Sequence, residues 1–208
     1  YLHGGPAFPN YFLIDRYKPG LENLFTVCYW AQRGGGLSYS QTLTPESMTF
    51  AQLVSDALEV TQYLRKRFGK EKIYLMAHSG GTPIGILAAA EAPDFYHAYI
   101  GMAQISNQPE SEKIAYQYIR EQYRLKSDKS VLSALDKLPV MESDTNILPF
   151  YQPLIRDKTM HALGIGTMRN MRSVFKDVFI PVWTCKAYTL KEKINIWKSK
   201  FIFLKKTP

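Results

Sequence analysis

The chain has 208 residues, of which 46% are hydrophobic and 21% are charged, and its formal net charge is +8. These proportions are ordinary for a soluble globular protein with one sizeable core. No apolar run is long enough to span a membrane, and two cysteines, Cys28 and Cys185, are too few for a disulfide framework. We therefore predict a protein of the reducing cytoplasm.

The excess of positive charge is concentrated late in the chain, in lysines spread along a helix-like segment: Lys186, Lys191, Lys193, Lys198, Lys200, Lys205 and Lys206. No dense basic run with interleaved aromatic residues accompanies them, and no nucleic-acid-binding motif is present. We expect a solvated surface, with no nucleic-acid and no membrane partner. The sequence leaves the oligomeric state open.

The first third of the chain predicts two strands, a flexible loop and a helix. Tyr1–Pro6 is typical of a strand that ends in a glycine-rich turn, and Leu24–Trp30 is rich in residues that favour strands. The loop Ala31–Ser38 has several glycines but no Lys-Ser/Thr after them, which excludes a phosphate-binding loop. A capping box of Thr49 and Gln52 then predicts the start of an amphipathic helix.

The stretch Lys72–Gly81 carries the strongest functional pattern. Ile73–Met76 predicts a buried strand, and Thr82–Ala92 predicts a helix of small and apolar residues. Between them, Ser79 lies among small residues, as in the sharp strand–turn–helix arrangement of a nucleophile elbow. The alternative is a turn serine that only caps the helix it precedes.

After a break at Pro93, Tyr96–Ile105 predicts a further buried strand. The order of strands and helices up to this point is typical of a parallel α/β sheet. From Asn107 onward, helical patterns punctuated by prolines replace this alternation. We predict two domains: a partial α/β core over residues 1–106 and a helical cap, or lid, over residues 107–208.

Three motifs, His3–Pro6, Gln32–Ser38 and His78–Gly81, occur in this order on these elements. Together they resemble the α/β-hydrolase-fold serine hydrolases, and in particular the prolyl-aminopeptidase-like group. The resemblance extends through Ile105, and the helical remainder is similar to the cap of that group. It implies an α/β-hydrolase-type parallel sheet with a helical cap, incomplete at both ends because the first and last strands of the fold have no counterpart here.

The sequence departs from the pattern of this group at three positions. Ala7 replaces the last glycine of His-Gly-Gly-Pro-Gly, and Ala31 replaces the aspartate of Asp-Gln-Arg-Gly. Gly80 follows the serine directly, where aminopeptidase members commonly carry an aromatic residue. Because that aromatic residue helps to wall the substrate pocket, a preference for amino-terminal proline does not follow from the resemblance.

The resemblance implies a serine hydrolase that cleaves an ester, an amide or a small peptide through an acyl-serine intermediate. Ser79 would be the nucleophile, the backbone N–H groups of Gly80 and Gly5 would form the oxyanion hole, and the turn of His3 and Gly4 would contact substrate. This fold delivers the acid and the histidine of the triad after its late strands, so we expect neither in this chain and little activity from it alone. We expect no cofactor, and the four scattered histidines favour no metal site.

The other candidate side chains are expected to serve the fold. His78, His97 and His161 are not expected to act as the base, and Arg33 is expected to anchor its loop by hydrogen bonds. Five aromatic residues at helical spacing are expected to lie in a core more often than in a pocket under the cap: Tyr116, Tyr118, Tyr123, Trp183 and Trp197.

Two further function classes stay open. The chain could belong to a non-catalytic member of the fold that binds a small ligand or a partner without turnover. A basic nucleic-acid-binding protein is the third alternative. An aspartate after a late strand and a histidine near the end of the protein would favour the enzyme.

Overall fold

The computed structural model describes residues 1–5, 8–142, 150, 155–166, 169–171 and 173–206. The chain forms two compact units, the first made of Tyr1–Ile105 and Val178–Pro208 and the second of Ser106–Asp177. The predicted domain boundary lies next to the end of the first segment. Residues 178–208, however, belong to the first unit, although the sequence analysis included them in the helical region. The assignment of Ser106–Asp177 as a cap stays a prediction.

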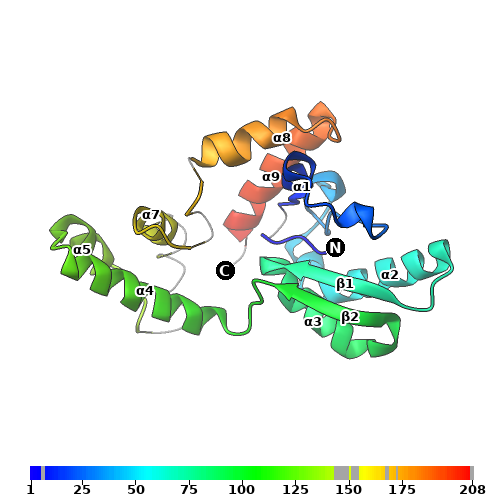
Figure 1. Cartoon of the computed structure of the whole chain (residues 1–208), viewed down its shortest axis with the longest axis horizontal. Helices are drawn as coiled ribbons and strands as arrows, with labels where there is room; N and C mark the ends of the chain where they lie inside the picture. The colour runs from blue at the N-terminus through cyan, green and yellow to red at the C-terminus, as the bar shows by residue number, and fades with distance from the viewer. Residues whose placement is uncertain (6–7, 143–149, 151–154, 167–168, 172, 207–208) are drawn as a thin grey trace. The chain divides into compact units, whose positions relative to one another are not determined.

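The first unit is built on a parallel sheet. Strands β1 (Ile73–His78) and β2 (Tyr96–Met102) pair in parallel, and Leu2 forms isolated parallel bridges to Trp30 and to Ala77 of β1. The backbone segments therefore run side by side in the order Trp30, Leu2, β1, β2 (Figure 1). This arrangement confirms the parallel α/β class that the alternation of patterns predicted.

The predicted strand Leu24–Trp30 is wrong for most of its length. Only Trp30 forms a bridge, and Leu24 is 81% exposed. The reason is the neighbouring segment: a strand needs backbone partners, and Tyr1 and Leu2 supply them only beside Cys28 and Trp30. A run of residues with high strand propensity does not form a strand unless its backbone groups pair with another segment.

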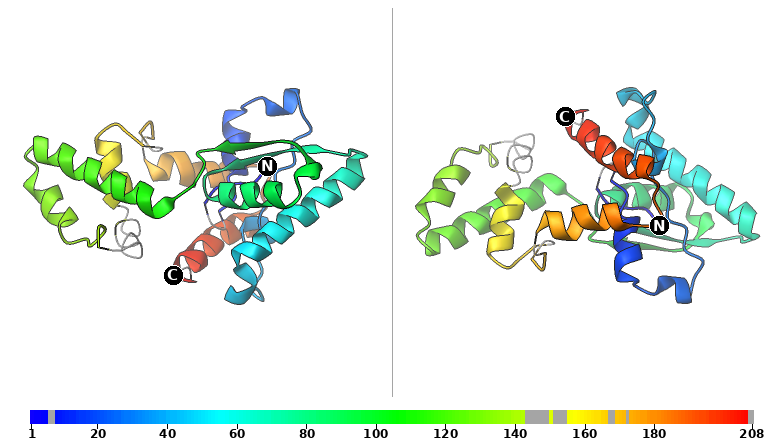
Figure 2. Two further views of the ribbon diagram at one scale, coloured as in Figure 1. Left: turned by 90° about the horizontal axis from the view of Figure 1, so that it is seen from below. Right: turned by 90° about the horizontal axis from the view of Figure 1, so that it is seen from above.

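Two helices cover one face of this sheet. Helix α2 (Phe50–Phe68) begins at Thr49, whose hydroxyl oxygen accepts a hydrogen bond of 3.2 Å from the Gln52 N–H, as the capping box predicted. It ends at Gly69, whose φ of +60° is the left-handed C-cap conformation. Helix α3 (Thr82–Glu91) connects β1 to β2 and packs beside α2 on the same face (Figure 2).

The core of this layer lies between the sheet and the two helices. Leu75 and Ala77 of β1 are buried there, together with Ala57 of α2 and Ala88 of α3. Alternate residues of the strands point to the opposite face, where Tyr74 stays 53% exposed. The face that carries α2 and α3 is thus the packed one.

Further helices complete the first unit. They are α1 (Tyr11–Tyr17), α8 (Ile180–Thr184) and α9 (Leu190–Lys206), with short 3₁₀ segments η1 (Leu21–Asn23), η2 (Gly36–Ser38), η3 (Pro45–Met48) and η5 (Pro93–Phe95). Phe12, Val182 and Ile196 form a second core cluster that joins α1, α8 and α9. The hydroxyl of Ser199 on α9 accepts a hydrogen bond of 3.2 Å from the Gly36 N–H. These contacts explain why the end of the chain belongs to the first unit.

The second unit is helical in its described part. It contains α4 (Gln108–Leu125), α5 (Lys129–Leu135) and α7 (Ile155–Ala162), and the π-helical η7 (Phe175–Phe179) crosses its boundary. Asn107 and Asp128 cap α4 and α5 through their side-chain oxygens. A separate core of Ile119, Leu135 and Phe150 holds the helices together. None of the helices in the described residues is long and apolar enough to cross a membrane.

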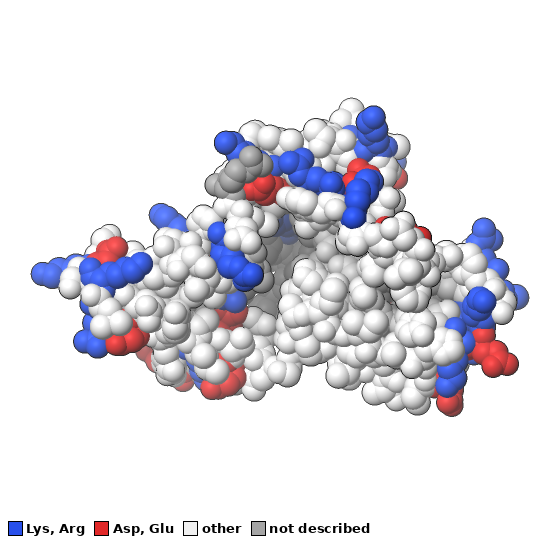
Figure 3. Space-filling model, viewed as in Figure 1, with Lys and Arg blue, Asp and Glu red and all other residues white. Residues whose placement is uncertain are grey.

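Charged side chains are scattered over the surface. Figure 3 shows Lys and Arg at several separate places on the face in view, with Asp or Glu beside many of them. Surface pairs such as Arg124 with Glu121 and Lys18 with Asp15 are examples. The net charge therefore does not form one patch on that face.

Candidate active site

Ser79 lies on a strained turn at the carboxyl end of β1. Its φ is +47°, a left-handed value that is uncommon for residues other than glycine. The strand ends at His78, the 3₁₀ turn η4 (Ser79–Gly81) follows, and α3 begins at Thr82. This strand–turn–helix geometry, with a positive φ at the central serine, is that of a nucleophile elbow.

Thr82 holds this turn in place. It is completely buried, and its hydroxyl donates a hydrogen bond of 2.6 Å to the Ser79 carbonyl oxygen. The same hydroxyl oxygen accepts a hydrogen bond of 3.0 Å from the Ile105 N–H. Because both bonds are made inside the first unit, the strained turn is fixed by the fold around it.

The small residues around Ser79 are required by close backbone contacts. A Cβ atom on Gly81 would lie 2.5 Å from the His3 carbonyl oxygen, and one on Gly4 would lie 2.8 Å from the Ser79 Cβ. One on Gly85 would lie 2.9 Å from the Ala77 Cβ. The elbow and the glycine turn, Gly4 and Gly5, are thus packed at distances that only glycine allows.

The two backbone groups proposed for the oxyanion hole lie side by side. A Cβ atom on Gly80 would be 3.1 Å from the Gly5 nitrogen, so the Gly5 N–H belongs to a peptide unit that touches the elbow. Gly5 itself has a φ of +69°. The fold therefore brings Gly5 together with Ser79 and Gly80, which lie 74 and 75 residues later in the sequence (79 − 5 and 80 − 5).

His3 is buried, with only 2% of its surface exposed, and both ring nitrogens have partners. Its Nδ1 lies 3.1 Å from the Gly4 carbonyl oxygen, and its Nε2 accepts a hydrogen bond of 3.2 Å from the Gln32 N–H. Burial lowers the pKa of His3 to about 4. The ring is therefore neutral at pH 7 and holds the glycine turn, while a contact between substrate and the turn of His3 and Gly4 stays a prediction.

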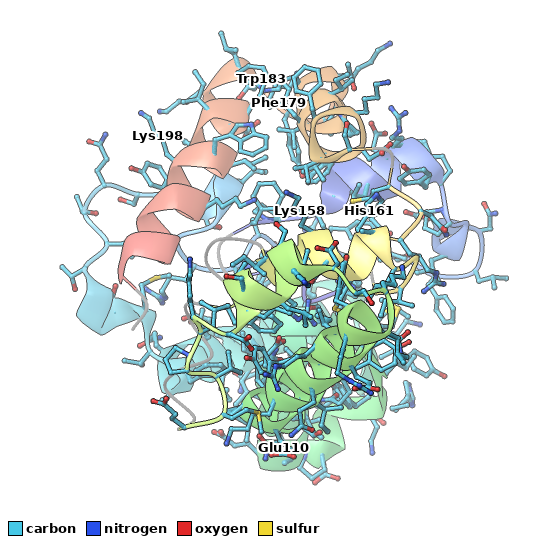
Figure 4. The ribbon with its side chains drawn as sticks, turned by 90° about the vertical axis from the view of Figure 1, so that its left-hand side faces the viewer. Glu110, Lys158, His161, Phe179, Trp183 and Lys198 are labelled. Carbon is cyan, nitrogen blue, oxygen red and sulfur yellow. The ribbon has the colours of Figure 1, made fainter. Side chains whose placement is uncertain are left out.

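The remaining histidines do not reach the serine through a hydrogen bond. His78 is half-buried, and burial lowers its pKa. His97 stacks with Tyr74 at 5.2 Å between ring centroids, and His161 lies on α7 of the second unit (Figure 4). Among the described residues, no hydrogen bond joins the Ser79 hydroxyl to a histidine. That the base of the triad lies outside this chain stays a prediction.

Arg33 anchors its loop, as the sequence indicated. Its guanidinium donates two hydrogen bonds, of 2.6 and 2.5 Å, to the carboxylate of Asp56 on α2. Asp56 also accepts a bond of 2.9 Å from the Gln52 side chain. Burial alone would raise the pKa of Asp56, but these hydrogen bonds outweigh it and the pKa is lowered. Sequence reasoning missed Asp56, although a carboxylate on the apolar stripe of α2 is the signal of a buried ion pair.

The aromatic residues considered as pocket lining serve two cores. Tyr116 and Tyr123 are buried in the second unit, where their hydroxyls donate to the carbonyl oxygens of Leu135 and Thr159. In the first unit, Phe179 packs against Trp183 and Trp197 at 5.9 and 5.5 Å between centroids; the first of these contacts is seen in Figure 4. The fifth, Tyr118, is 47% exposed. Four of the five thus pack within a unit.

A cavity of about 680 Å³ lies elsewhere in the first unit. It is lined mainly by apolar side chains, which come from residues 21 and 24–28, from α2 and from the strands, but not by Ser79, Gly4 or Gly5. This cavity is therefore separate from the elbow. Across the described residues, no group of three or more His, Cys, Asp or Glu side chains is arranged to hold a metal ion.

Comparison with known proteins agrees with this geometry. Residues 21–176 match the family described as serine aminopeptidase, S33. Over 137 residues, or 66% of its length, the chain is 40% identical to the probable aminopeptidase YbaC of Bacillus subtilis (strain 168). The match covers 43% of that relative, so the chain spans less than half of its length. The α/β-hydrolase and aminopeptidase-like resemblance is thereby confirmed, and the chain belongs to the S33 serine aminopeptidase family of the α/β-hydrolase fold.

Proposed function

We propose that Ser79 is the nucleophile of a serine hydrolase that cleaves an ester, an amide or a small peptide through an acyl-serine intermediate. One observation carries the proposal: Ser79 has a φ of +47° at the end of β1, and its turn is packed against Gly4. Strain of this kind persists only where the surrounding structure enforces it, and it is typical of functional sites.

The chemistry follows from the groups around the serine. The Ser79 oxygen attacks the carbonyl carbon of the substrate, and the carbonyl oxygen takes up the negative charge. The N–H groups of Gly80 and Gly5 donate hydrogen bonds to this oxyanion. A general base takes the Ser79 hydroxyl proton and passes it to the leaving group, which departs. Water, losing a proton to the same base, then attacks the acyl carbon, and the serine oxygen leaves and takes the proton back. Loss of one oxyanion donor slows such a reaction by roughly a hundredfold or more.

The Ser79 hydroxyl needs a general base, because it is a weak nucleophile at its own pKa. We do not assign this role to a histidine of this chain. Both ring nitrogens of His3 are engaged, and His97 of β2 stacks with Tyr74. The buried Nδ1 of His78 has no hydrogen-bond partner among the described residues. The acid and the base are accordingly proposed to be contributed by other residues of the protein.

The substrate class follows the family. The similar protein of Bacillus subtilis is named a probable aminopeptidase, so peptides with a free amino terminus are the first substrates to test. Gly80 leaves no aromatic wall beside the serine, and we therefore propose no preference for amino-terminal proline. Ser106–Asp177 is proposed to act as the cap over the substrate. The two free cysteines fit a reducing cytoplasmic compartment.

Labelling with a fluorophosphonate probe tests the nucleophile. We expect the full product of the gene to react covalently at Ser79 and the Ser79→Ala variant not to react. Ser40→Ala is a matched control, because this exposed serine lies in a loop of the same unit and should leave labelling unchanged. If the folded protein does not react at all, the non-catalytic, ligand-binding alternative is favoured.

The assignment of the base is tested by removing histidines. We expect His78→Gln and His161→Gln to label at nearly the rate of the unchanged protein. Loss of a triad member costs roughly a thousandfold or more. A loss of that size in either variant would place the base within this chain and contradict the assignment.

A further inference from the structure

Gln32 holds His3 from two sides. Its backbone N–H donates to Nε2 of the His3 ring at 3.2 Å, and its side-chain amide donates to the His3 carbonyl oxygen at 2.9 Å. Both residues are buried, with 5% and 2% of their surfaces exposed. Hydrogen bonds of this kind are strengthened by the low local dielectric and are costly to leave unmade.

These partners determine the tautomer of His3. A backbone N–H can only donate, so Nε2 must carry a lone pair toward Gln32. Nδ1 then carries the hydrogen and donates it to the Gly4 carbonyl oxygen at 3.1 Å. The ring is thus a fixed bridge from the Gln32 backbone to the carbonyl group of Gly4.

The direction of that carbonyl group determines the direction of the next N–H. The peptide unit that joins Gly4 to Gly5 is planar and trans, so its C=O and N–H bonds point in opposite directions. A peptide between two glycines can turn over at little steric cost. By holding the Gly4 oxygen, His3 therefore prevents this peptide from turning, and it orients the Gly5 N–H beside Gly80.

We propose that Gln32, acting through His3, is a positioning residue that orients the Gly5 N–H as a donor to the oxyanion. This rests on the function proposed above, in which Ser79 forms a tetrahedral intermediate. Gln32 touches neither the reacting atoms nor the substrate in this scheme. Its contribution is realised only when negative charge develops on the substrate oxygen, so it lowers the barrier rather than improving substrate binding.

The test separates turnover from binding in the full product of the gene, with 4-nitrophenyl acetate as substrate. Gln32→Met removes the side-chain donor, and His3→Leu removes the bridge to Gly4. We expect kcat to fall by about tenfold in the first and about a hundredfold in the second, with KM changed by less than about twofold. His3→Asn should recover part of the loss, because its side-chain amide can again donate to the Gly4 oxygen.

Thr61→Val is the matched control. Thr61 is buried in the same unit and shares a hydrogen bond of 3.0 Å with the Tyr96 hydroxyl, away from the glycine turn. Its loss should lower the melting temperature and leave kcat unchanged. If Gln32→Met does not fold, Gln32→Leu, which likewise has no donor for the His3 carbonyl oxygen, takes its place.

Two outcomes would overturn the inference. One is a folded Gln32 variant with unchanged kcat; the other is a rise in KM alone. Failure of the proposed function is distinguishable, because there the unchanged protein would not react with the fluorophosphonate probe at Ser79.

Discussion

The elbow in the first unit and the helical core of the second unit are built in different ways. Around Ser79, contacts are made largely by backbone atoms and glycines, and the buried ring of His3 is neutral at pH 7. In the second unit, side chains hold the helices. Glu112 on α4, 1% exposed, forms an ion pair of 2.5 Å with Arg156 on α7, and the Tyr123 hydroxyl bonds to α7 as well.

The two units are therefore sensitive to different kinds of substitution. A site built from backbone groups is sensitive to added atoms, because nothing near it can move aside. A core specified by buried polar side chains is sensitive to removed partners, because a lone buried charge is costly. The predictions below test this contrast in order of decreasing effect.

Removal of the cation from the buried pair should have the largest effect. Arg156→Met leaves the buried Glu112 carboxyl without its cationic partner. Burial already raises the pKa of this carboxyl, because it disfavours the charged form. We expect the free energy of unfolding of the second unit to fall by about 4 kcal/mol, measured by urea denaturation. The double variant Glu112→Gln/Arg156→Met should recover most of the loss. A double variant no more stable than Arg156→Met would show that packing, not charge, is responsible.

An added methyl group at the elbow should come next. In Gly81→Ala the new Cβ would lie 2.5 Å from the His3 carbonyl oxygen, a backbone atom that cannot rotate away. We expect a destabilisation of about 3 kcal/mol in urea denaturation, together with loss of labelling at Ser79.

Gly69→Ala is the control for this substitution. Gly69 has a φ of +60° but no atom within 4 Å of an added Cβ, so only backbone strain is introduced. The cost should be about 1 kcal/mol, with labelling unchanged. Equal costs at the two glycines would mean that crowding at the elbow is not what requires Gly81.

Acid should destabilise the first unit through His3. Its pKa is about 4 in the folded state and about 6.5 in the unfolded state, because burial disfavours the charged ring. The unfolded state therefore takes up a proton first as the pH falls. The contribution of the neutral ring is complete above about pH 6.5 and is lost between pH 6.5 and pH 4, by at most about 3 kcal/mol.

The measurement is the urea midpoint of the unchanged protein and of His3→Asn from pH 7 to pH 4. The difference between the two removes the contribution of other groups that titrate in this range. We expect the unchanged protein to lose more stability than the variant as the pH falls. Parallel curves would show that His3 does not titrate on unfolding in this window.

A single buried hydroxyl should have the smallest effect. Tyr123→Phe removes a hydrogen bond of 3.2 Å to the Thr159 carbonyl oxygen and leaves the ring packed. We expect a loss of about 1 kcal/mol in the second unit by urea denaturation. Tyr118→Phe is the control, since that ring is 47% exposed and should change stability little. An effect as large at Tyr118 as at Tyr123 would contradict the role of the buried bond.

Local patterns were sufficient for the elements that position the candidate site. The run Ile73–Met76, the small residues around Ser79 and the capping box at Thr49 predicted a strand, a turn and a helix start, and the structure has all three. These features depend on neighbours within a few residues, through side-chain periodicity, steric size and a hydrogen bond to Gln52. The parallel class of the sheet followed from their order.

What the sequence alone left undecided depends on partners far along the chain. Leu24–Trp30 has the composition of a strand, yet its pairing was decided by how much backbone Tyr1 and Leu2 present to it. Gln32 meets His3 across 29 residues, and Ser199 meets Gly36 across 163, which placed the end of the chain in the first unit. Composition and spacing determine which segments are strands, turns and helices in isolation, whereas hydrogen bonds and close packing between distant segments exist only in the folded chain.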